Sequence, residues 1–314
     1  MRIPYSPHII PALVDLYERH RKSTDPSAPR LPGNYWEGTF CSADIDPAED
    51  VIIFSTGTDP KKPAAFAWMY ENRAGSNIYL RGPYLDISET GFRELNDAIL
   101  DVASDRLKRS SAGSLEVRLT NEVLMELFGN RGFEKQGSYE KYRLFPLKGD
   151  IGQGRSEEGI RLRRWSGLKD VPVLMKLFNR IFCSHWDFIE SERADWEKVV
   201  RNRSFSEKLV TILEDGGKPA GYAFGQRYID YEVHSVEGAY LASIGLLPEW
   251  RGRGLGRILF SGWLSGVYEE GARSVLLDVD SENIVAQGLY RSFGFRVQTT
   301  EEVWRFSRET AGEK

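Results

Sequence analysis

The chain has 314 residues, more than one typical domain, and it is 41% hydrophobic and 12% aromatic, which is enough for packed cores. Its formal net charge of −4 provides no general attraction for nucleic acid or for an anionic membrane. No apolar run approaches the roughly 18 residues of a membrane span, and the first residues lack the apolar region of a signal peptide. We therefore expect two domains in a cytoplasmic protein that binds neither nucleic acid nor a membrane.

Metal-binding and disulfide patterns are missing from the sequence. Cys41 and Cys183 fall in different halves, and the 4 histidines are scattered without the spacing of a zinc site. We expect free thiols and no metal. The sequence carries no signal for the oligomeric state.

The two halves of the chain repeat one pattern. A constant shift places Asn121 on Asn283, and it also places residues 115–118 on 277–280, 132–133 on 294–295 and 142–144 on 304–306. A slightly different shift aligns residues 62–66 with 218–222. We therefore expect two copies of one α/β fold, at residues 1–146 and 160–314, joined by a glycine-rich, charged linker at 147–159.

The clearest elements of the second half alternate between strand and helix. Residues 240–247 have the pattern of a buried strand that ends at Pro248. Apolar residues then recur at helical spacing from Leu255 to Val267, and a second strand follows at 274–279. Residues 280–283 are rich in N-cap types, which predicts a short helix at 284–293 that ends at Gly294. A last pair of strands is expected around 295–297 and 303–306.

Residues 249–257 join three glycines to three arginines where the strand gives way to the helix. Glycines let several backbone N–H groups approach one anion, the helix start adds its positive dipole end, and arginines supply counter-charge, so the segment predicts a pyrophosphate site. The spacing of Gly252, Gly254 and Gly256 differs from the dinucleotide fingerprint, and no Walker-type Gly-Lys-Ser/Thr follows. An arginine-glycine segment that binds RNA is usually repetitive, whereas this segment occurs once, between ordered elements. A plain turn with solvated arginines stays the competing interpretation.

Two motifs in order resemble the GCN5-related N-acetyltransferase (GNAT) superfamily. Arg251-x-x-Gly254-x-Gly256 is similar to its acetyl-CoA pyrophosphate loop, and Asn283…Tyr290…Gly294-Phe295 is similar to the helix segment that follows. The resemblance covers about residues 160–306, and the tandem layout is similar to the mycothiol synthase branch. It implies a tandem GNAT fold, with two mixed-sheet domains flanked by helices and the catalytic copy at 160–314.

The resemblance implies acetyl-CoA as co-substrate and a primary amine of a small molecule or peptide as acceptor. It assigns the binding of acetyl-CoA to a set of residues from the strand, the loop and the second helix: Ile244, Gly245, Leu246, Arg251, Gly252, Arg253, Gly254, Leu255, Gly256, Arg257 and Asn283. An acyl-CoA-binding sensor and a transferase for longer acyl or aminoacyl groups stay open as alternatives.

Acetyl transfer to an amine needs an acid for the departing thiolate and a base for the incoming ammonium. Tyr290 is the candidate acid, because it shares one helix face with Asn283; an ordinary core tyrosine is the alternative. Glu237 is the first choice of base, just before the central strand. Three further candidates are Glu232, His234 and Tyr240.

The acceptor side is expected along residues 177–205, which are rich in aromatic side chains. Such a stretch is usually a buried helix face, although it also suits the wall of a small-molecule site. Its acidic residues either attract a cationic amine or form a solvated helix face.

The first half lacks the features of the loop. The shift places residues 89–94, with two glutamates and a phenylalanine, on 251–256, and Phe128 on Tyr290. Carboxylates repel a diphosphate, and a phenyl ring has no hydroxyl. We expect the N-terminal copy to keep the fold without the chemistry, either as a wall of the substrate cleft or as a stabilising partner.

Overall fold

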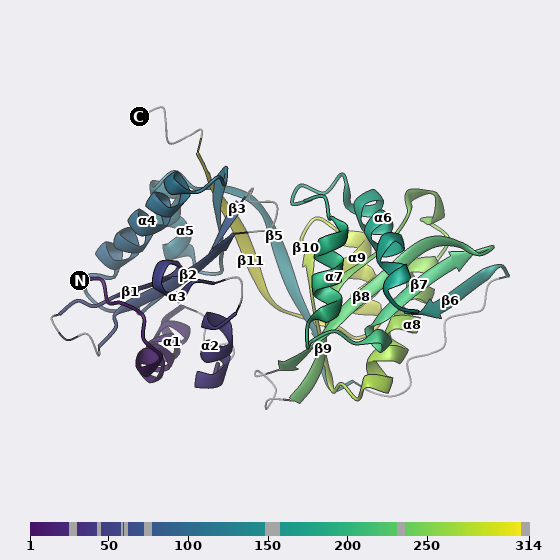
Figure 1. Cartoon of the computed structure of the whole chain (residues 1–314), viewed down its shortest axis with the longest axis horizontal. Coiled ribbons are helices and arrows are strands. Elements are labelled where there is room, and N and C mark those ends of the chain that lie inside the picture. The colour runs from purple at the N-terminus through teal and green to yellow at the C-terminus, as the bar shows by residue number, and fades with distance from the viewer. Residues whose placement is uncertain are drawn as a thin grey trace. The chain divides into compact units, whose positions relative to one another are not determined.

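The computed structural model describes residues 1–24, 30–42, 45–57, 59, 62–71, 77–147, 158–230 and 236–308. The chain divides into an N-terminal unit, Met1–Tyr139 with Thr300–Lys314, and a C-terminal unit, Glu140–Thr299. Each unit is a mixed β-sheet with helices on both faces, which is the fold class expected from the sequence (Figure 1). Within the described part of the chain, no helix combines the length and apolar character needed to cross a bilayer.

The division differs from the expected boundaries at 146 and 160. Strand β5 (Glu134–Leu144) begins in the N-terminal unit and ends in the C-terminal unit, whereas β11 (Arg296–Ser307) does the reverse. Tyr142 is 0% exposed in the C-terminal core, while Trp304 and Phe306 pack against the N-terminal core. The repeat shows which strands are equivalent, but not which sheet each one joins. Most of the expected linker, residues 148–157, lies outside the described residues.

The N-terminal sheet runs β1 (Val51–Phe54), β2 (Ala65–Glu71), β3 (Asn77–Leu85), β4 (Ser114–Leu119), β11. Only the β3–β4 pair is parallel among these neighbours. Alternate residues of β2 enter different cores, because successive strand side chains point to opposite faces. Phe66 and Trp68 pack with α1 (Ile10–Thr24) and α2 (Gly33–Phe40).

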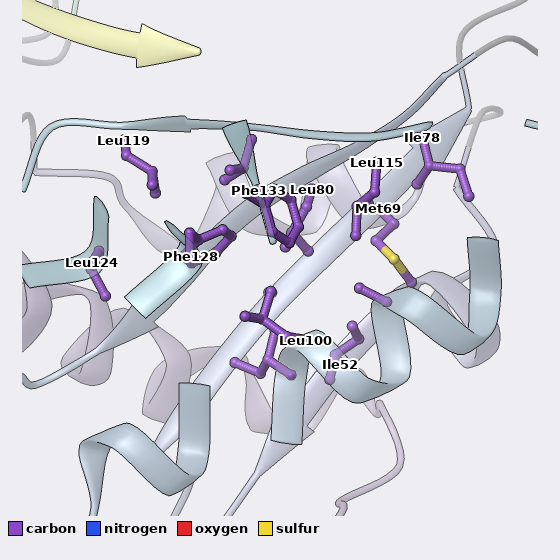
Figure 2. Packing of buried hydrophobic residues seen from close by; sticks show 14 of the residues in the cluster. Ile52, Met69, Ile78, Leu80, Leu100, Leu115, Leu119, Leu124, Phe128 and Phe133 are labelled. Carbon is purple, nitrogen blue, oxygen red and sulfur yellow. The ribbon is translucent and has the colours of Figure 1, made fainter. Parts of the chain in front are cut away.

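The other face of this sheet carries α4 (Phe92–Arg109) and α5 (Glu122–Asn130), and α3 (Pro47–Asp50) leads into β1. Met69, Ile78 and Leu115 of the strands gather over Leu100 of α4 (Figure 2). Leu100 is 1% exposed and Met69 1%, so the N-terminal unit has a closed core of its own.

The C-terminal sheet runs β5, β10 (Ser274–Asp280), β9 (Val236–Leu246), β8 (Lys218–Asp230), β7 (Val210–Asp215), β6 (Ile160–Arg164). Helices α6 (Val171–Phe182) and α7 (Arg193–Arg201) pack on one face, and α8 (Leu255–Glu270) and α9 (Ile284–Ser292) on the other. The strand, helix, strand and helix expected from 240 to 293 are therefore present. The expected strand pair after Gly294 is instead the single strand β11, because residues 298–302 contain no turn-forming glycine, proline or asparagine.

The starts of equivalent helices correct one detail of the repeat. Asn121 caps α5 and Asn283 caps α9, which confirms that alignment. Gly91 and Gly254 are the left-handed N-caps of α4 and α8, with φ of 88° and 76°. Gly91 therefore corresponds to Gly254, one residue away from the expected register. The third residue of each helix is then Glu94 in the N-terminal unit and Arg257 in the C-terminal unit.

Candidate active site

Strands β9 and β10 separate toward their carboxyl ends. Their parallel pairing ends at Leu241 and Leu277, although β9 continues to Leu246 and β10 to Asp280. Beyond that point β9 stays paired with β8, after a bulge at Ala242. Among the described residues, the segment 242–246 of β9 thus has one edge without a pairing partner in β10. A strand edge with exposed N–H and C=O groups is a place where an extended ligand adds.

The loop that follows β9 presents the N-terminus of α8. Gly252 and Gly254 both have φ of +76°, a conformation that residues with a side chain rarely adopt. A Cβ atom at either glycine would meet nothing within 4 Å, so the backbone conformation rather than crowding requires glycine. In the described part of the chain, no side chain caps the N-terminus of α8. Its first N–H groups and its positive dipole end are therefore presented to an anion, as the sequence predicts.

Each of the three arginines of the loop contacts other groups of the protein. Arg251 donates from Nε to the carbonyl of Leu246 (3.0 Å) and from Nη2 to that of Ile181 (3.3 Å). Arg253 lies 3.2 Å from a carboxylate oxygen of Asp215. The carbonyls and the carboxylate that lie beside the loop thus fix the direction of both guanidinium groups.

Arg257 is anchored on the other side of the helix start. Its Nη1 donates to the Ser292 hydroxyl (2.8 Å), and its guanidinium lies 4.5 Å from the centre of the Phe293 ring. Leu255 is fully buried beneath the loop, and a Cβ at Gly256 would just touch the Leu246 side chain at 4.0 Å. Arg257 thus ties the start of α8 to the end of α9.

The three predicted strand residues lie in the unpaired part of β9. Ile244 and Leu246 are half-buried against the core beneath α8. A Cβ at Gly245 would lie 2.4 Å from Cγ2 of Ile181, so glycine allows α6 to pack directly on this strand. The structure therefore brings residues 244–246 and 251–257 together around one strand end and one helix start.

Asn283 is exposed and caps α9, with its Oδ1 accepting the N–H of Ala286 at 3.0 Å. Asn121 does the same for α5, accepting from Val123 at 3.0 Å and Leu124 at 3.3 Å. Because the unit without the glycine loop has the same cap, this contact of Asn283 is a property of the fold. A role in binding acetyl-CoA stays a prediction.

Tyr290 is 4% exposed, and its ring lies 5.3 Å from that of Phe260 and 6.0 Å from that of Phe295. Burial raises the pKa of its hydroxyl well above the usual value. Among the described residues none forms a hydrogen bond with this hydroxyl. The ring is held by the core, and the hydroxyl keeps its proton at neutral pH.

Glu237 does not join these residues. It is exposed near the start of β9, where its carbonyl accepts the N–H of Arg273 at 2.8 Å. Seven residues separate it from Ile244, which corresponds to roughly 23 Å along a strand. Two alternatives, Glu232 and His234, lie outside the described residues. The fourth candidate, Tyr240, donates its hydroxyl to Oδ2 of Asp278 at 3.2 Å.

Two carboxylates on β10 were not singled out from the sequence. Asp278 and Asp280 lie two residues apart and so share one face of the strand. Asp280 Oδ2 accepts Nε1–H of Trp186 (2.8 Å) and lies 3.1 Å from Nε2 of His185. The alternation Asp-Val-Asp at the carboxyl end of a parallel strand was the available signal, because such ends commonly carry functional residues.

The aromatic segment 177–205 is mostly core, as such stretches usually are. Trp196 is 6% exposed and packs on Phe224, with Phe178 and Phe182 around it. His185 and Trp186 are the exceptions that reach β10. Cys41 and Cys183 are both free and exposed.

Comparison with known proteins agrees with this geometry. Residues 172–295 match the model of the Acetyltransferase (GNAT) family. Among curated proteins, mycothiol acetyltransferase of Pseudarthrobacter chlorophenolicus is 24% identical over 192 residues, 61% of this chain and 57% of that protein. The Kocuria rhizophila mycothiol acetyltransferase is 36% identical over 161 residues, 47% of this chain and 50% of that protein. The chain thus spans little more than half the length of these relatives.

Solved structures extend the likeness to both units. A GCN5-related N-acetyltransferase from Sphaerobacter thermophilus has a TM-score of 0.80 at 18% identity, covering 98% of this chain and 95% of that one. A tandem GNAT protein from the clavulanic acid biosynthesis pathway has a TM-score of 0.68 at 13% identity and covers 98% of both chains. At these identities the likeness shows the fold alone, and that fold is a tandem GNAT fold. The family match itself places a GNAT acetyltransferase domain at residues 172–295, within the C-terminal unit.

Proposed function

We propose that the protein transfers the acetyl group of acetyl-CoA to a primary amine of a small molecule or peptide. The observation that carries this proposal is the uncapped N-terminus of α8 behind the left-handed glycines Gly252 and Gly254, beside the unpaired edge of β9. Acetyltransferases of the GNAT family use acetyl-CoA as co-substrate. The helix start suits the pyrophosphate of acetyl-CoA, and the strand edge suits its amide-containing arm.

The residues divide the work of binding. N–H groups at the start of α8 would hold the pyrophosphate, and the edge of β9 at residues 244–246 would pair with the amide-containing arm. Asn283, exposed at the start of α9, offers its side-chain amide to the same arm. The thioester supplies an acyl carbon that an amine attacks.

Tyr290 would donate a proton to the departing sulfur. Burial raises its pKa, so the phenol stays protonated throughout about pH 6 to 9 and the acid remains available there. The N-terminal unit has Phe128 at this place, fully buried and without a hydroxyl. The difference between the two units supports a chemical role for the hydroxyl of Tyr290.

Curated relatives bear the name mycothiol acetyltransferase, which favours a small molecule over a peptide as acceptor. The N-terminal unit places Glu94 in the first turn of α4, where a carboxylate repels phosphate. We therefore assign the reaction to the C-terminal unit alone.

The test is calorimetry with acetyl-CoA, followed by a panel of primary amines read out by release of free thiol. We expect binding to the wild-type protein and thiol release with at least one amine. Tyr290→Phe should lower kcat roughly 100-fold while the Kd for acetyl-CoA stays near wild type. Binding without turnover on any amine would indicate a sensor, and a preference for longer acyl-CoA would indicate a different donor.

A further inference from the structure

We propose that Asp278 accepts the proton from the acceptor ammonium, an assignment that rests on the proposed function. Asp278 is the first residue of β10 beyond its last pair with β9, at Leu277. Across the opening lies Ala242, the exposed bulge residue of β9. Paired strands lie about 4.8 Å apart. Asp278 follows the last pair directly, so it lies at the point where β9 and β10 begin to separate.

The side chain of Asp278 faces the α6 and α7 side of the sheet. Tyr240, on β9, donates its hydroxyl to Oδ2 of Asp278 at 3.2 Å. Asp280, two residues further on the same face, is bonded to His185 and Trp186 of the α6–α7 connection. Asp278 thus lies on the α6 and α7 side of the strand opening, opposite the face that carries α8 and Tyr290.

Neighbouring titratable groups are committed to other contacts. Asp280 accepts N–H groups from Trp186, His185 and Glu282. His185 uses Nδ1 to accept the N–H of Asp187 at 3.1 Å, which leaves Nε2 as the donor to Asp280. Asp280 thus acts as a positioning residue that fastens the α6–α7 connection to β10.

Tyr222 is also unsuited to accept a proton. It is fully buried, its hydroxyl donates to Ser243 at 2.9 Å, and burial raises its pKa. Glu237 lies near the opposite end of β9, as described above. Of the described carboxylates of Glu237, Asp278 and Asp280, that of Asp278 is therefore the one that lies on this face at the strand opening.

The N-terminal unit offers an internal comparison. Glu116 occupies the equivalent of Asp278, but it is 1% exposed and receives a hydrogen bond from Arg305 at 2.7 Å. Arg118 occupies the equivalent of Asp280. The unit without the glycine loop thus bonds its carboxylate to a guanidinium, whereas the C-terminal unit presents two carboxylates on this face. A cationic amine suits the second arrangement.

The proposed reaction moves protons through both Asp278 and Tyr290. The ammonium gives one proton to Asp278, and the freed lone pair on nitrogen forms the bond to the acyl carbon. The C–S bond breaks with its electron pair on sulfur, which takes a proton from Tyr290. The second nitrogen proton leaves to solvent, Tyr290 regains one from solvent, and Asp278 releases its own. The products are an amide, a free thiol and one proton.

The experiment measures kcat/KM against pH for the wild type and for Asp278→Asn, with the best amine of the panel and with methoxyamine, which is already neutral at pH 7. For an alkyl amine, Asp278→Asn should lower kcat/KM roughly 100-fold at pH 7 and recover as pH approaches the pKa of the amine. With methoxyamine the loss should be less than tenfold. Asp278→Glu, which keeps a carboxylate, should retain more activity than Asp278→Asn.

Other readouts separate this role from a structural one. The melting temperature and the Kd for acetyl-CoA of Asp278→Asn should match the wild type. Asp280→Asn should raise KM for the amine without changing the shape of the pH profile. A wild-type pH profile for Asp278→Asn, equal losses with both amines, or a pH-rescued loss in Glu237→Gln would overturn the assignment. Failure of the wild type to bind acetyl-CoA or acetylate any amine would instead refute the proposed function, and this role with it.

Discussion

Arg251 illustrates how one side chain holds a loop in place through backbone carbonyls. Two of its N–H groups are committed to the carbonyls of Leu246 and Ile181, at the ends of β9 and α6. These two hydrogen bonds connect the loop to the end of β9 and to the end of α6. The sequence motif identified the residue, but the direction of its guanidinium depends on carbonyls that only the fold brings near.

We expect Arg251→Gln to lower the free energy of unfolding by about 1–2 kcal/mol, because charged hydrogen bonds to two carbonyls are lost. Acetyl-CoA binding should weaken as well, since the loop loses its anchor. Arg253→Gln is the matched control: Arg253 is 41% exposed in its ion pair with Asp215, and such pairs contribute about 0–1 kcal/mol. Urea denaturation and calorimetry measure both. Weaker binding by Arg251→Gln at unchanged stability would show a direct phosphate ligand instead.

At the scale of elements, the start of α8 combines a requirement for left-handed glycine with the surface that we propose binds acetyl-CoA. Its N-cap Gly254 and its C-cap Gly271 both have left-handed φ, 76° and 84°, and neither would crowd a Cβ within 4 Å. One helix therefore carries two glycines with the same backbone requirement, only one of which lies in the loop.

Alanine substitutions at Gly254 and Gly271 distinguish the cost of backbone strain from an effect on acetyl-CoA binding. Gly254→Ala and Gly271→Ala should each cost about 1 kcal/mol of stability, the usual penalty for a left-handed residue with a Cβ. Only Gly254→Ala should also weaken acetyl-CoA binding, because its methyl group would stand among the N–H groups of the helix start. Thermal melts and calorimetry of the pair provide the test. Equal affinity in the two variants would remove the loop from the binding site.

The opening between parallel strands is a second property of elements, and it occurs in both units. In the N-terminal unit, the pairing of β3 with β4 ends at Leu80 and Val117, while β3 continues to Leu85. The opening therefore belongs to the fold. The C-terminal unit differs in the residues around this opening: it has Tyr290 and Asp278 where the N-terminal unit has Phe128 and Glu116.

For the whole molecule, the main finding is that each unit is completed by the end of the other repeat. Residues 300–307 of β11 pair with β4 from Glu302 to Ser307 and place Trp304 and Phe306 against the N-terminal core. Tyr142, at the end of β5, is buried in the C-terminal core. A fragment of residues 160–314, the catalytic domain expected from sequence, would therefore lack part of its own core.

Truncation after Thr299 should destabilise the N-terminal unit selectively. It removes the partner strand of β4 and leaves the buried carboxylate of Glu116 without Arg305. We expect the melting transition of the N-terminal unit to fall or vanish while the C-terminal unit still melts cooperatively, as followed by calorimetry and hydrogen exchange. A chain ending at Arg308 keeps all of β11 and is the control. Two unchanged transitions after truncation at 299 would contradict the strand assignment.

Local features of the sequence determined the order of the helices and strands around the loop and the places where the helices begin. Left-handed glycines, helix caps and apolar periodicity depend on residues close in the chain, which is why the order of elements around the loop and the capping position of Asn283 were predicted correctly. The motif pair indicated the family for the same reason. From Phe128 and Glu94 the sequence also predicts that the N-terminal unit does not catalyse the reaction, and this stays a prediction.

Only the tertiary structure decided the features that join distant residues. Glu237 lies near the start of β9, and the length of that extended strand separates it from the loop at the other end. Asp278 meets Tyr240, and Asp280 meets His185, because two strands and a helix connection converge there. The sequence also did not predict that β5 and β11 each begin in one unit and end in the other. A repeat identifies equivalent strands, but strand pairing depends on contacts made across the sheet.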